Sequence, residues 1–474
     1  MIIVLLLALP LLASLILFTG KIGKHSREFA LVASLLEFAV AMVAGYAFTF
    51  ADNKILNLSL NLKQSLDIDI IINLDAISLL MIILTTLVVP IIIASNNIRK
   101  VRNHNFFGLI LLMQLALIGV FTASEMILFY IFWELAMIPI FLITVIWGGQ
   151  NRVKISVKFL IYTIVGSFAM LIAILYLYTL TPAPHSFSFE AFYQLKLPYS
   201  VQVPVFLAFF LAFAIKIPLF PFHSWQAETY NVSPVQGSML LAGIMLKMGL
   251  YGIIRFILPI CPDVVAGGSL IFLPIILFGV IYGAIIAIRQ PKLKKMIAFV
   301  SLSHVGIIAL GLLSTNHYAI QGAILQMFSH GVNVVGFFLC YQIIVIRTGT
   351  DILGNLGGIA SAAPKFATIF LIIVLANIGL PLTNSFVGEF LILLGLFQSN
   401  IYIGIIAGFT IILGAVYMLK MYQQVMYGPQ TTATSKFHDL TTREMLLFVP
   451  IIISIFLIGV YPSFVLQMLQ TAVK

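Results

Sequence analysis

Two side chains of opposite charge stand inside apolar stretches of the chain. Glu134 follows Trp133 in the stretch 126–147, and Lys216 lies in the stretch 204–222. A charge at membrane depth is costly unless a partner or water is close by. Because the two residues are expected at similar depth, we predict that they form an ion pair. A neutral, hydrogen-bonded Glu134 and a Lys216 that snorkels from a kinked helix are the alternatives.

Other titratable side chains lie near the centres of further apolar stretches, and both histidines among them follow a serine. They are Lys247, His304 after Ser303, His330 after Ser329, and Glu389. Ionisable residues within membrane spans mark ion or proton pathways, and histidine exchanges protons near neutral pH. We therefore predict proton transfer through Glu134, Lys216, Lys247, His304, His330 and Glu389. A single buried histidine is commonly a satisfied core residue, and this alternative applies to each histidine taken alone.

Weaker candidates surround this set. We expect a secondary polar relay at His223, Ser303, Ser329 and Lys420. His223 has the weaker claim among the histidines because it lies at the end of a predicted span.

Proline and glycine interrupt two predicted helices close to the charged residues. Pro218 and Pro221 follow Lys216, and Gly379 and Pro381 precede Glu389. Proline removes a backbone donor and leaves a carbonyl one turn earlier unpaired. Broken backbone at membrane depth is tolerated only inside protein or beside a wet cavity. We predict that these two discontinuous helices admit water to the relay.

The helices that position these residues must lie in a membrane, because 62% of the chain is hydrophobic and only 8% is charged. A membrane-spanning helix needs about 20 apolar residues. Fourteen stretches qualify. They are 2–19, 29–50, 76–95, 106–123, 126–147, 157–180, 204–222, 235–257, 270–288, 296–314, 319–347, 366–397, 401–423 and 446–469. We therefore predict an all-α polytopic membrane protein with about 14 transmembrane helices.

Basic residues gather in alternate loops. The richer loops carry Arg99, Lys100, Arg152, Lys154, Lys158, Arg289, Lys292, Lys294, Lys295, Arg347 and Lys365 among others, whereas the opposite loops carry only Lys54, Lys63 and Lys196, besides the terminal Lys474. The positive-inside rule places the richer loops in the cytoplasm and both termini on the outer side. The basic residues behind the net charge of +10 therefore indicate how the chain is oriented in the membrane, and we expect no nucleic-acid partner.

The chain contains a short internal repeat. Leu246-Lys247-Met248 follows one broken helix and Leu419-Lys420-Met421 follows the other, five spans later. An odd offset reverses direction across the membrane, as inverted repeats require. We predict two inverted five-helix repeats with discontinuous helices seven and twelve. The expected regions are an N-terminal three-helix scaffold with an external loop at 1–105, the repeats at 106–257 and 258–423, and a cytoplasmic loop with the last span at 424–474.

The sequence offers no ligand set for a redox centre. Two cysteines, Cys261 and Cys340, cannot build a four-thiolate cluster or a zinc site, and no Gly-rich phosphate loop follows a strand. We expect neither a metal nor a cofactor in this chain. Its work must then use protons, ions or small solutes.

Several of these motifs together resemble the antiporter-like subunits of proton-pumping NADH:quinone oxidoreductase, respiratory complex I. The resemblance runs from about span four to span thirteen. It rests on Trp133-Glu134-Leu135, the stretch 216–225, Lys294-Lys295 leading to Ser303-His304, and Ser329-His330-Gly331. At the positions of Val334 and Glu389, many relatives carry lysine. The residues found here resemble those of one branch, bacterial subunit M or mitochondrial subunit 4. Lys292 departs from the family, which usually has aspartate there.

The resemblance implies a proton translocator driven by redox chemistry in other subunits. Glu134 and Lys216 would be the coupling pair, Lys247 the central carrier, His304 and His330 the link between the halves, and Glu389 the terminal group toward the exit. Flavin, iron–sulfur clusters and quinone are expected in partner subunits. The expected partners are other membrane-arm subunits, especially the two other antiporter-like ones, and lipids, in a bacterial cytoplasmic membrane.

Two other functions fit the same residues. One is a subunit of a cation/proton antiporter or a membrane-bound hydrogenase-type complex. The other is a stand-alone solute transporter with inverted repeats, which predicts activity of the isolated chain.

Overall fold

The computed structural model describes residues 2–50, 57–61, 69–96 and 103–470, and most of them are helical. They fall into two compact units. The first contains residues 1–216 and 247–267, and the second contains residues 217–246 and 268–473. The predicted all-α membrane class is confirmed, with one short hairpin as the exception.

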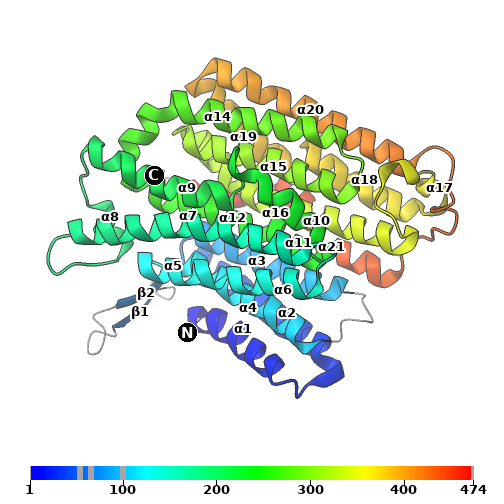
Figure 1. Ribbon diagram of the computed structural model, residues 1–474, viewed down its shortest axis with the longest axis horizontal. Helices are drawn as coiled ribbons and strands as arrows, with labels where there is room; N and C mark the ends of the chain where they lie inside the picture. Colours follow the sequence, from blue (N-terminus) through cyan, green and yellow to red (C-terminus); the bar gives the residue numbers. More distant parts are fainter. Residues whose placement is uncertain (1, 51–56, 62–68, 97–102, 471–474) are drawn as a thin grey trace. The chain divides into compact units, whose positions relative to one another are not determined.

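The first unit begins with four helices, continues with shorter ones and contains the long helix α7 (Figure 1). Its elements are α1 (Ile2–Phe18), α2 (Ser26–Phe50), α3 (Ala76–Ser95), α4 (His104–Thr122), α5 (Met126–Leu135), α6 (Met137–Trp147), α7 (Arg152–Leu180), α8 (Phe189–Tyr193), α9 (Tyr199–Lys216), α12 (Leu246–Gly252), η5 (Ile253–Ile257) and α13 (Leu258–Ile260). Strands β1 (Asn57–Asn61) and β2 (Asp69–Asn73) form an antiparallel hairpin in the loop before α3. The alternation of apolar and polar residues at 66–70 is typical of a strand; positions 69 and 70 lie in β2, whereas 66–68 lie outside the described residues.

Helices α1 to α4 pack against one another, and α7 packs along α9. The side chains of α3 are nearly all buried, as expected for a helix that is apolar on every face. Its first turn is capped by Asp75, which accepts a hydrogen bond from the Ser78 amide at 2.9 Å. Arg255 forms an ion pair with the same carboxylate.

The second unit is built around one long central helix. Its elements are η3 (Phe222–Trp225), α10 (Gln226–Val232), α11 (Val235–Leu240), η4 (Leu241–Met245), α14 (Pro262–Arg289), α15 (Leu293–Leu313), α16 (His317–Thr348), η6 (Leu353–Asn355), α17 (Ile359–Ala362), α18 (Pro364–Ile378), α19 (Asn384–Ser399), α20 (Ile401–Met426), α21 (Thr442–Val460) and α22 (Ser463–Gln470). Helix α16 is buried almost throughout, and it contacts α15, α18, α19 and α21. Figure 1 shows α16 among these helices.

Helices α16 and α19 approach each other closely through two glycines. A Cβ atom on Gly322 would lie 2.7 Å from the carbonyl oxygen of Gly388, and one on Gly388 would lie 2.6 Å from Oε1 of Gln326. Neither position leaves room for a larger side chain, because real Cβ atoms do not approach other atoms so closely. The contact sets the register in which Gln326 faces the residue after Gly388.

Helix lengths agree with most predicted spans. Among the described residues, 12 helices are long and apolar enough to cross a membrane, and three more apolar helices, α1, α18 and α19, are shorter. Fourteen crossings follow if α1 crosses once and if α18 and α19 cross together. The exact number therefore stays a prediction, as do the inverted repeats.

Several predicted spans differ in detail. The seventh span was expected at 204–222, but its helix ends at Lys216. Pro218 explains this end, because proline lacks an amide hydrogen and disfavours a helical conformation in the residue before it. Helix α10, between this break and α11, was not predicted. The fifth span is divided at Ala136 into α5 and α6. The eighth, Val235–Ile260, contains two π-helical segments, η4 and η5.

Candidate functional site

Glu389 lies at the second helix break, where two helices meet end to end in the second unit. Helix α18 ends at Ile378, Gly379 follows with φ of +77°, and α19 begins at Asn384. Glycine adopts this left-handed conformation without steric cost. A Cβ atom on Gly379 would also lie 2.7 Å from Oε2 of Glu389. The glycine thus gives both the turn and the space for the carboxylate.

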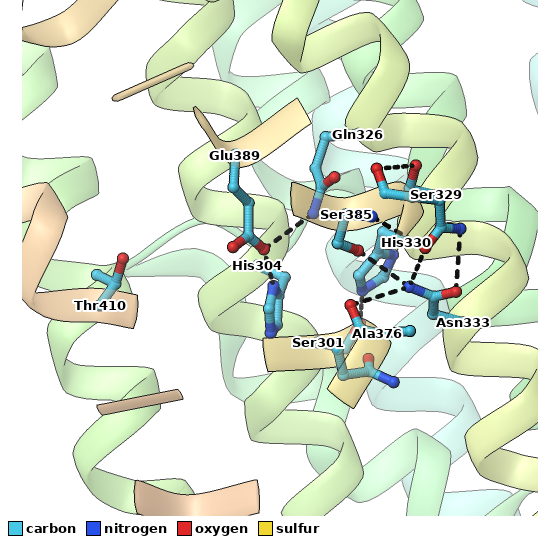
Figure 2. Close-up of polar contacts among 12 residues, drawn as sticks. Ser301, His304, Gln326, Ser329, His330, Asn333, Ala376, Ser385, Glu389 and Thr410 are labelled. Atoms are coloured by element: carbon cyan, nitrogen blue, oxygen red, sulfur yellow. Dashed lines mark hydrogen bonds and ion pairs between the residues drawn. The ribbon is translucent and has the colours of Figure 1, made fainter. Parts of the chain in front are cut away.

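The carboxylate of Glu389 is held by two polar side chains from neighbouring helices (Figure 2). Nε2 of Gln326 on α16 donates to Oε1 at 3.0 Å, and Nδ1 of His304 on α15 lies 3.1 Å from the same oxygen. About an eighth of each of the His304 and Glu389 side chains is exposed, at 12%. An ionisable pair in such a sheltered place can share or transfer a proton along a formed hydrogen bond.

His304 has a second partner on its other ring nitrogen. The hydroxyl of Tyr417 on α20 lies 3.3 Å from Nε2. The pattern is satisfied when Nδ1 carries the hydrogen toward the carboxylate and Nε2 accepts from the phenol. The chain Tyr417–His304–Glu389 therefore connects three helices through titratable atoms.

A cavity of about 20 Å³ lies against this chain of contacts. Its lining includes Ser303, His304, Glu389, Thr410 and Tyr417. Figure 2 shows Thr410 across from the Glu389 carboxylate. A polar cavity needs roughly 10–15 Å³ to hold one water molecule, so this cavity has room for about one.

The two predicted histidines lie near each other, but they are not hydrogen-bonded to each other. Their ring centroids are 6.1 Å apart. Nε2 of His330 lies 3.1 Å from the hydroxyl of Ser301, one turn before His304 on α15. Transfer between the rings would require a bridging water molecule or a rotation of one side chain.

Ser329 has a structural contact that the sequence did not suggest. Its hydroxyl donates to the carbonyl oxygen of Leu325 at 3.1 Å, and it lies 3.2 Å from the carbonyl oxygen of Asn384, the first residue of α19. Nδ2 of Asn333, one turn further along α16, donates to Oδ1 of Asn384 at 3.0 Å and to the hydroxyl of Ser385 at 2.9 Å (Figure 2). These amides fix the start of α19 and, through it, the position of Glu389.

In the first unit, Lys216 is the last residue of α9 and is 1% exposed. Its Nζ lies 4.8 Å from the ring centroid of Trp133, in a cation–π contact. The free carbonyls at a helix C-terminus also favour a cation there. Tryptophan and the helix end thus give the ammonium an electrostatic environment without a direct salt bridge.

Glu134 lies beside this lysine but does not bind it directly. Among the described residues, neither Oε1 of Glu134 nor Nζ of Lys216 has a hydrogen-bond partner, although both atoms are buried. The carboxylate does interact with the lysine electrostatically. Glu134 also stands in the last turn of α5, next to the division at Ala136. The predicted ion pair is therefore present only as neighbouring charges, and its function stays a prediction.

Lys247 is fully buried in the first unit, two residues after the end of the π-helical segment η4. π-helical turns are rare and occur frequently at functional sites. Gly252, one and a half turns later, packs against Phe213 of α9, where a Cβ atom would lie 2.5 Å from the ring. This close contact leaves no room for a wet gap at that level of α12.

The weaker candidates have separate surroundings. His223 lies in η3, stacked on Phe220 with a centroid distance of 5.6 Å. Lys420 is exposed near the end of α20 and lines a second cavity, of about 170 Å³, in the same unit. Lys294, counted with the cytoplasmic loop charges, is 5% exposed instead and donates to the carbonyl oxygen of Ser233 at 2.5 Å. It binds the end of the helix α10, which the sequence did not predict.

Comparison with known proteins places these residues in a family. The profile described as "NADH:quinone oxidoreductase/Mrp antiporter, TM" matches residues 123–414, more than half of the chain. The chain belongs to this family. The matched range contains Glu134, Lys216, Lys247, His304 and Glu389.

Relatives within the NADH:quinone oxidoreductase/Mrp antiporter family support the predicted branch. NADH-quinone oxidoreductase subunit M of Rhodobacter capsulatus is 35% identical, over 98% of this chain and 94% of that protein. NADH-ubiquinone oxidoreductase chain 4 of Marchantia polymorpha is 37% identical, over 86% of this chain and 82% of that protein. A chain of respiratory complex I from Thermus thermophilus has a TM-score of 0.91 and 29% identity, covering 100% of this chain and 98% of that one. The resemblance to subunit M is confirmed.

Proposed function

We propose that this chain is the proton-translocating subunit M of a proton-pumping NADH:quinone oxidoreductase, located in the membrane arm. The enzyme's redox chemistry would take place in partner subunits that hold flavin, iron–sulfur clusters and quinone. This chain would contribute the translocase step. The names of its relatives and its membership of the family support the assignment.

The observation that carries the proposal is the contact between Glu389 and His304 at the break between α18 and α19. Three properties suit it for proton transfer: a formed hydrogen bond between two titratable groups, shelter from bulk water, and an adjoining cavity for about one water molecule. The imidazole can take a proton on Nε2 and release another from Nδ1 to Oε1. The carboxylate then becomes neutral until the proton leaves.

Lys216 and Lys247 would serve the first unit in the same process. Lys216 carries its charge on the face of Trp133, and the neighbouring Glu134 interacts with it electrostatically. A change in the distance between the two side chains would change how strongly the proton is held. Side-chain movement at this pair would thus be coupled to proton release from Lys216, with little displacement of the backbone. His330 would extend the path at Ser301.

The location and partners belong to the same proposal. The subunit would lie in a bacterial cytoplasmic membrane with both termini on the outer side, as the loop charges predict. Its neighbours would be the other membrane-arm subunits, especially two other antiporter-like ones, and lipids. The predicted regions, 1–105, 106–257, 258–423 and 424–474, would be its scaffold, two inverted repeats and C-terminal span.

A cation/proton antiporter subunit is the second candidate, because the family description includes Mrp antiporters. The relatives cited above carry oxidoreductase names instead. A sodium gradient that drives proton movement in vesicles without NADH would favour the antiporter role.

Glu389→Gln in the intact complex tests the proposal. Glutamine keeps the size of the side chain and can still meet Gln326 and His304, but it cannot carry a proton. We expect NADH-driven proton uptake by inverted vesicles to fall at least about tenfold, because a positioned proton-transfer group contributes about 10²–10⁴-fold. NADH oxidation should be measured on the same membranes. Wild-type uptake in an assembled Glu389→Gln complex would contradict the proposed function.

A further inference from the structure

Two cavities of the second unit meet at a single side chain. The smaller one, beside Glu389 and His304, holds about 20 Å³, and the larger one, beside Lys420, holds about 170 Å³. Tyr417 lines both. It is 2% exposed, so the side chain that the two cavities share is sheltered from bulk water.

The larger cavity opens at the loop end of the helices. Its lining includes Pro291, Gly354, Lys420 and Gln424, which are all exposed. Pro291 lies beside Lys292, and Gly354 lies in the segment after Arg347 at the end of α16, on the side that the loop charges predict to be cytoplasmic. A polar volume of about 170 Å³ has room for several water molecules, at about 30 Å³ each.

One face of α20 connects the two cavities. Thr410, Gly414 and Tyr417 line the smaller cavity, and Tyr417, Lys420 and Gln424 line the larger one. Residues three and four apart lie on the same side of a helix, so these side chains form one continuous stripe. A Cβ atom on Gly414 would lie 3.6 Å from the Tyr417 hydroxyl, so the hydroxyl lies beside Gly414 on this stripe.

We propose that Tyr417 is a proton gate between the cytoplasmic-side cavity and the Glu389–His304 pair, through which this pair takes up protons. The inference rests on the proposed function and adds a route to it. It assigns Glu389 a connection to the cytoplasmic side, whereas the sequence resemblance implied only an exit.

The contacts define how a proton passes. An excess proton enters the larger cavity from the cytoplasmic side as a protonated water molecule. That water passes the proton to the phenol oxygen of Tyr417 and becomes neutral again, while the phenol gives its own proton to Nε2 of His304. The phenol is neutral before and after the exchange. The imidazolium then releases the proton on Nδ1 to Oε1 of Glu389, along the 3.1 Å contact. The ring keeps a proton on Nε2, so it must rotate before the next transfer, which makes each uptake a separate event.

Tyr417→Phe tests the gate by removing one oxygen atom from the intact complex. Without the hydroxyl, we expect NADH-driven proton uptake by inverted vesicles to fall at least about tenfold. Tyr422→Phe is the matched control on the same helix. Its hydroxyl donates to the carbonyl oxygen of Ala367 at 3.0 Å and lines neither cavity, so uptake should be unchanged.

Cysteine labelling gives a second readout that does not depend on pumping. Cys261 and Cys340 are both fully buried, which keeps the background low. We expect a small, water-soluble methanethiosulfonate added at the cytoplasmic face to modify Lys420→Cys rapidly. It should modify Thr410→Cys slowly when Tyr417 is present, and several-fold faster when Tyr417→Ala opens the gate.

The outcomes separate the two proposals. Lost uptake in Glu389→Gln with wild-type uptake in Tyr417→Phe would overturn the gate and leave the proposed function standing. Wild-type uptake in Glu389→Gln would overturn the proposed function itself. If Tyr417→Phe does not assemble, labelling decides: a rate at Thr410→Cys that Tyr417→Ala leaves unchanged, or labelling only from the outer face, would overturn the gate.

Discussion

Lys216 faces the ring of Trp133 at the end of its helix, and this geometry separates the role of its charge from the role of its proton. Arginine binds the face of an aromatic ring as well as lysine does, but its guanidinium does not release a proton in proteins. A Lys216→Arg variant should therefore retain assembly and the cation–π contact. The same variant should lose the ability to pass a proton on.

We expect Lys216→Arg to reduce NADH-driven proton uptake at least about tenfold. The measurement is uptake by inverted vesicles beside the amount of assembled complex. Lys154→Arg, an exposed position in the same unit, is the control and should behave as wild type. Full uptake in assembled Lys216→Arg would mean that the lysine acts only through its charge.

Among single residues, the sequence could predict those whose charge stands inside an apolar span, but it could not predict which side chains they contact. Glu389, His304 and Lys216 stand out in the sequence because titratable groups are rare in apolar spans. Tyr417 does not stand out, because it is one of 17 tyrosines and its role depends on which cavities its ring separates. Gln326 and Asn333 could have been found, since they share one helix face with His330. The spacing of Trp133 and Lys216 could not reveal their contact, because the two lie on different helices.

Among the elements, the break before Glu389 depends on Gly379. Alanine there must adopt a left-handed conformation, which costs about 1–2 kcal/mol, and its Cβ atom would displace the Glu389 carboxylate. Gly349 ends α16 in the same conformation, but a Cβ atom there would have no neighbour within 4 Å. Gly349→Ala should therefore have only the conformational cost.

We expect both alanine variants to lower the thermal unfolding temperature of the complex to a similar extent. Only Gly379→Ala should also lower proton uptake relative to the amount of assembled complex. Equal uptake in the two variants would show that the position of the carboxylate at the break is not critical.

A loop carboxylate holds the beginning of α18. Asp439 accepts hydrogen bonds from the amides of Lys365 and Phe366, at 3.1 and 3.0 Å. Partial burial raises the pKa of Asp439, but hydrogen bonds from the amides of Leu440, Phe366 and Lys365 outweigh it and hold the pKa below 3.8. A depressed pKa in the folded state means that the stabilisation is present above pH 3.8 and is lost as the pH falls through the folded value.

Asp439→Ala should therefore destabilise the protein at pH 7 by about 1 kcal/mol, as the loss of a helix cap does. The difference from wild type should narrow as the pH falls below 3.8. Thermal unfolding across this pH range measures it. A difference that does not change with pH would show that the ionised carboxylate is not the stabilising form.

Helix breaks could be predicted because proline and glycine change the backbone directly. The division at Ala136 and the π-helical segments could not be predicted in this way. The residues there, such as Leu241-Ala242-Gly243, are ordinary in any membrane helix, and packing against other helices decides the extra residue in the turn. Helix α10 was missed because it is only seven residues long, too short for its apolar period to be visible.

For the whole molecule, topology is the property that the loop charges predict most directly. Lys154 and Lys196 are both exposed, and the positive-inside rule places them on opposite sides of the membrane. We expect an impermeant maleimide to label Lys154→Cys in inverted vesicles and Lys196→Cys in right-side-out vesicles. Labelling of both from the same face would contradict the predicted orientation.

The fold class follows from composition, whereas the division into compact units does not. Hydrophobic content and span length were enough to predict a polytopic helical protein. The boundaries of the two units fall at Lys216 and Lys247, inside what the sequence described as one repeat. Sequence similarity between spans indicates symmetry, while compactness depends on contacts between distant residues, so the two need not agree.

The glycine contact between α16 and α19 determines which part of the second unit moves. Because Gly322 and Gly388 are in close contact, the two helices behave as one rigid body, and Gln326 cannot slide past Glu389. The moving part is then the size of one carboxylate arm, which swings about its own bonds. Collective helix shifts take microseconds to milliseconds, and the contact between these two helices removes the need for such a shift at this site. The slow step of the proton cycle must then be set by something other than the movement of these two helices past each other.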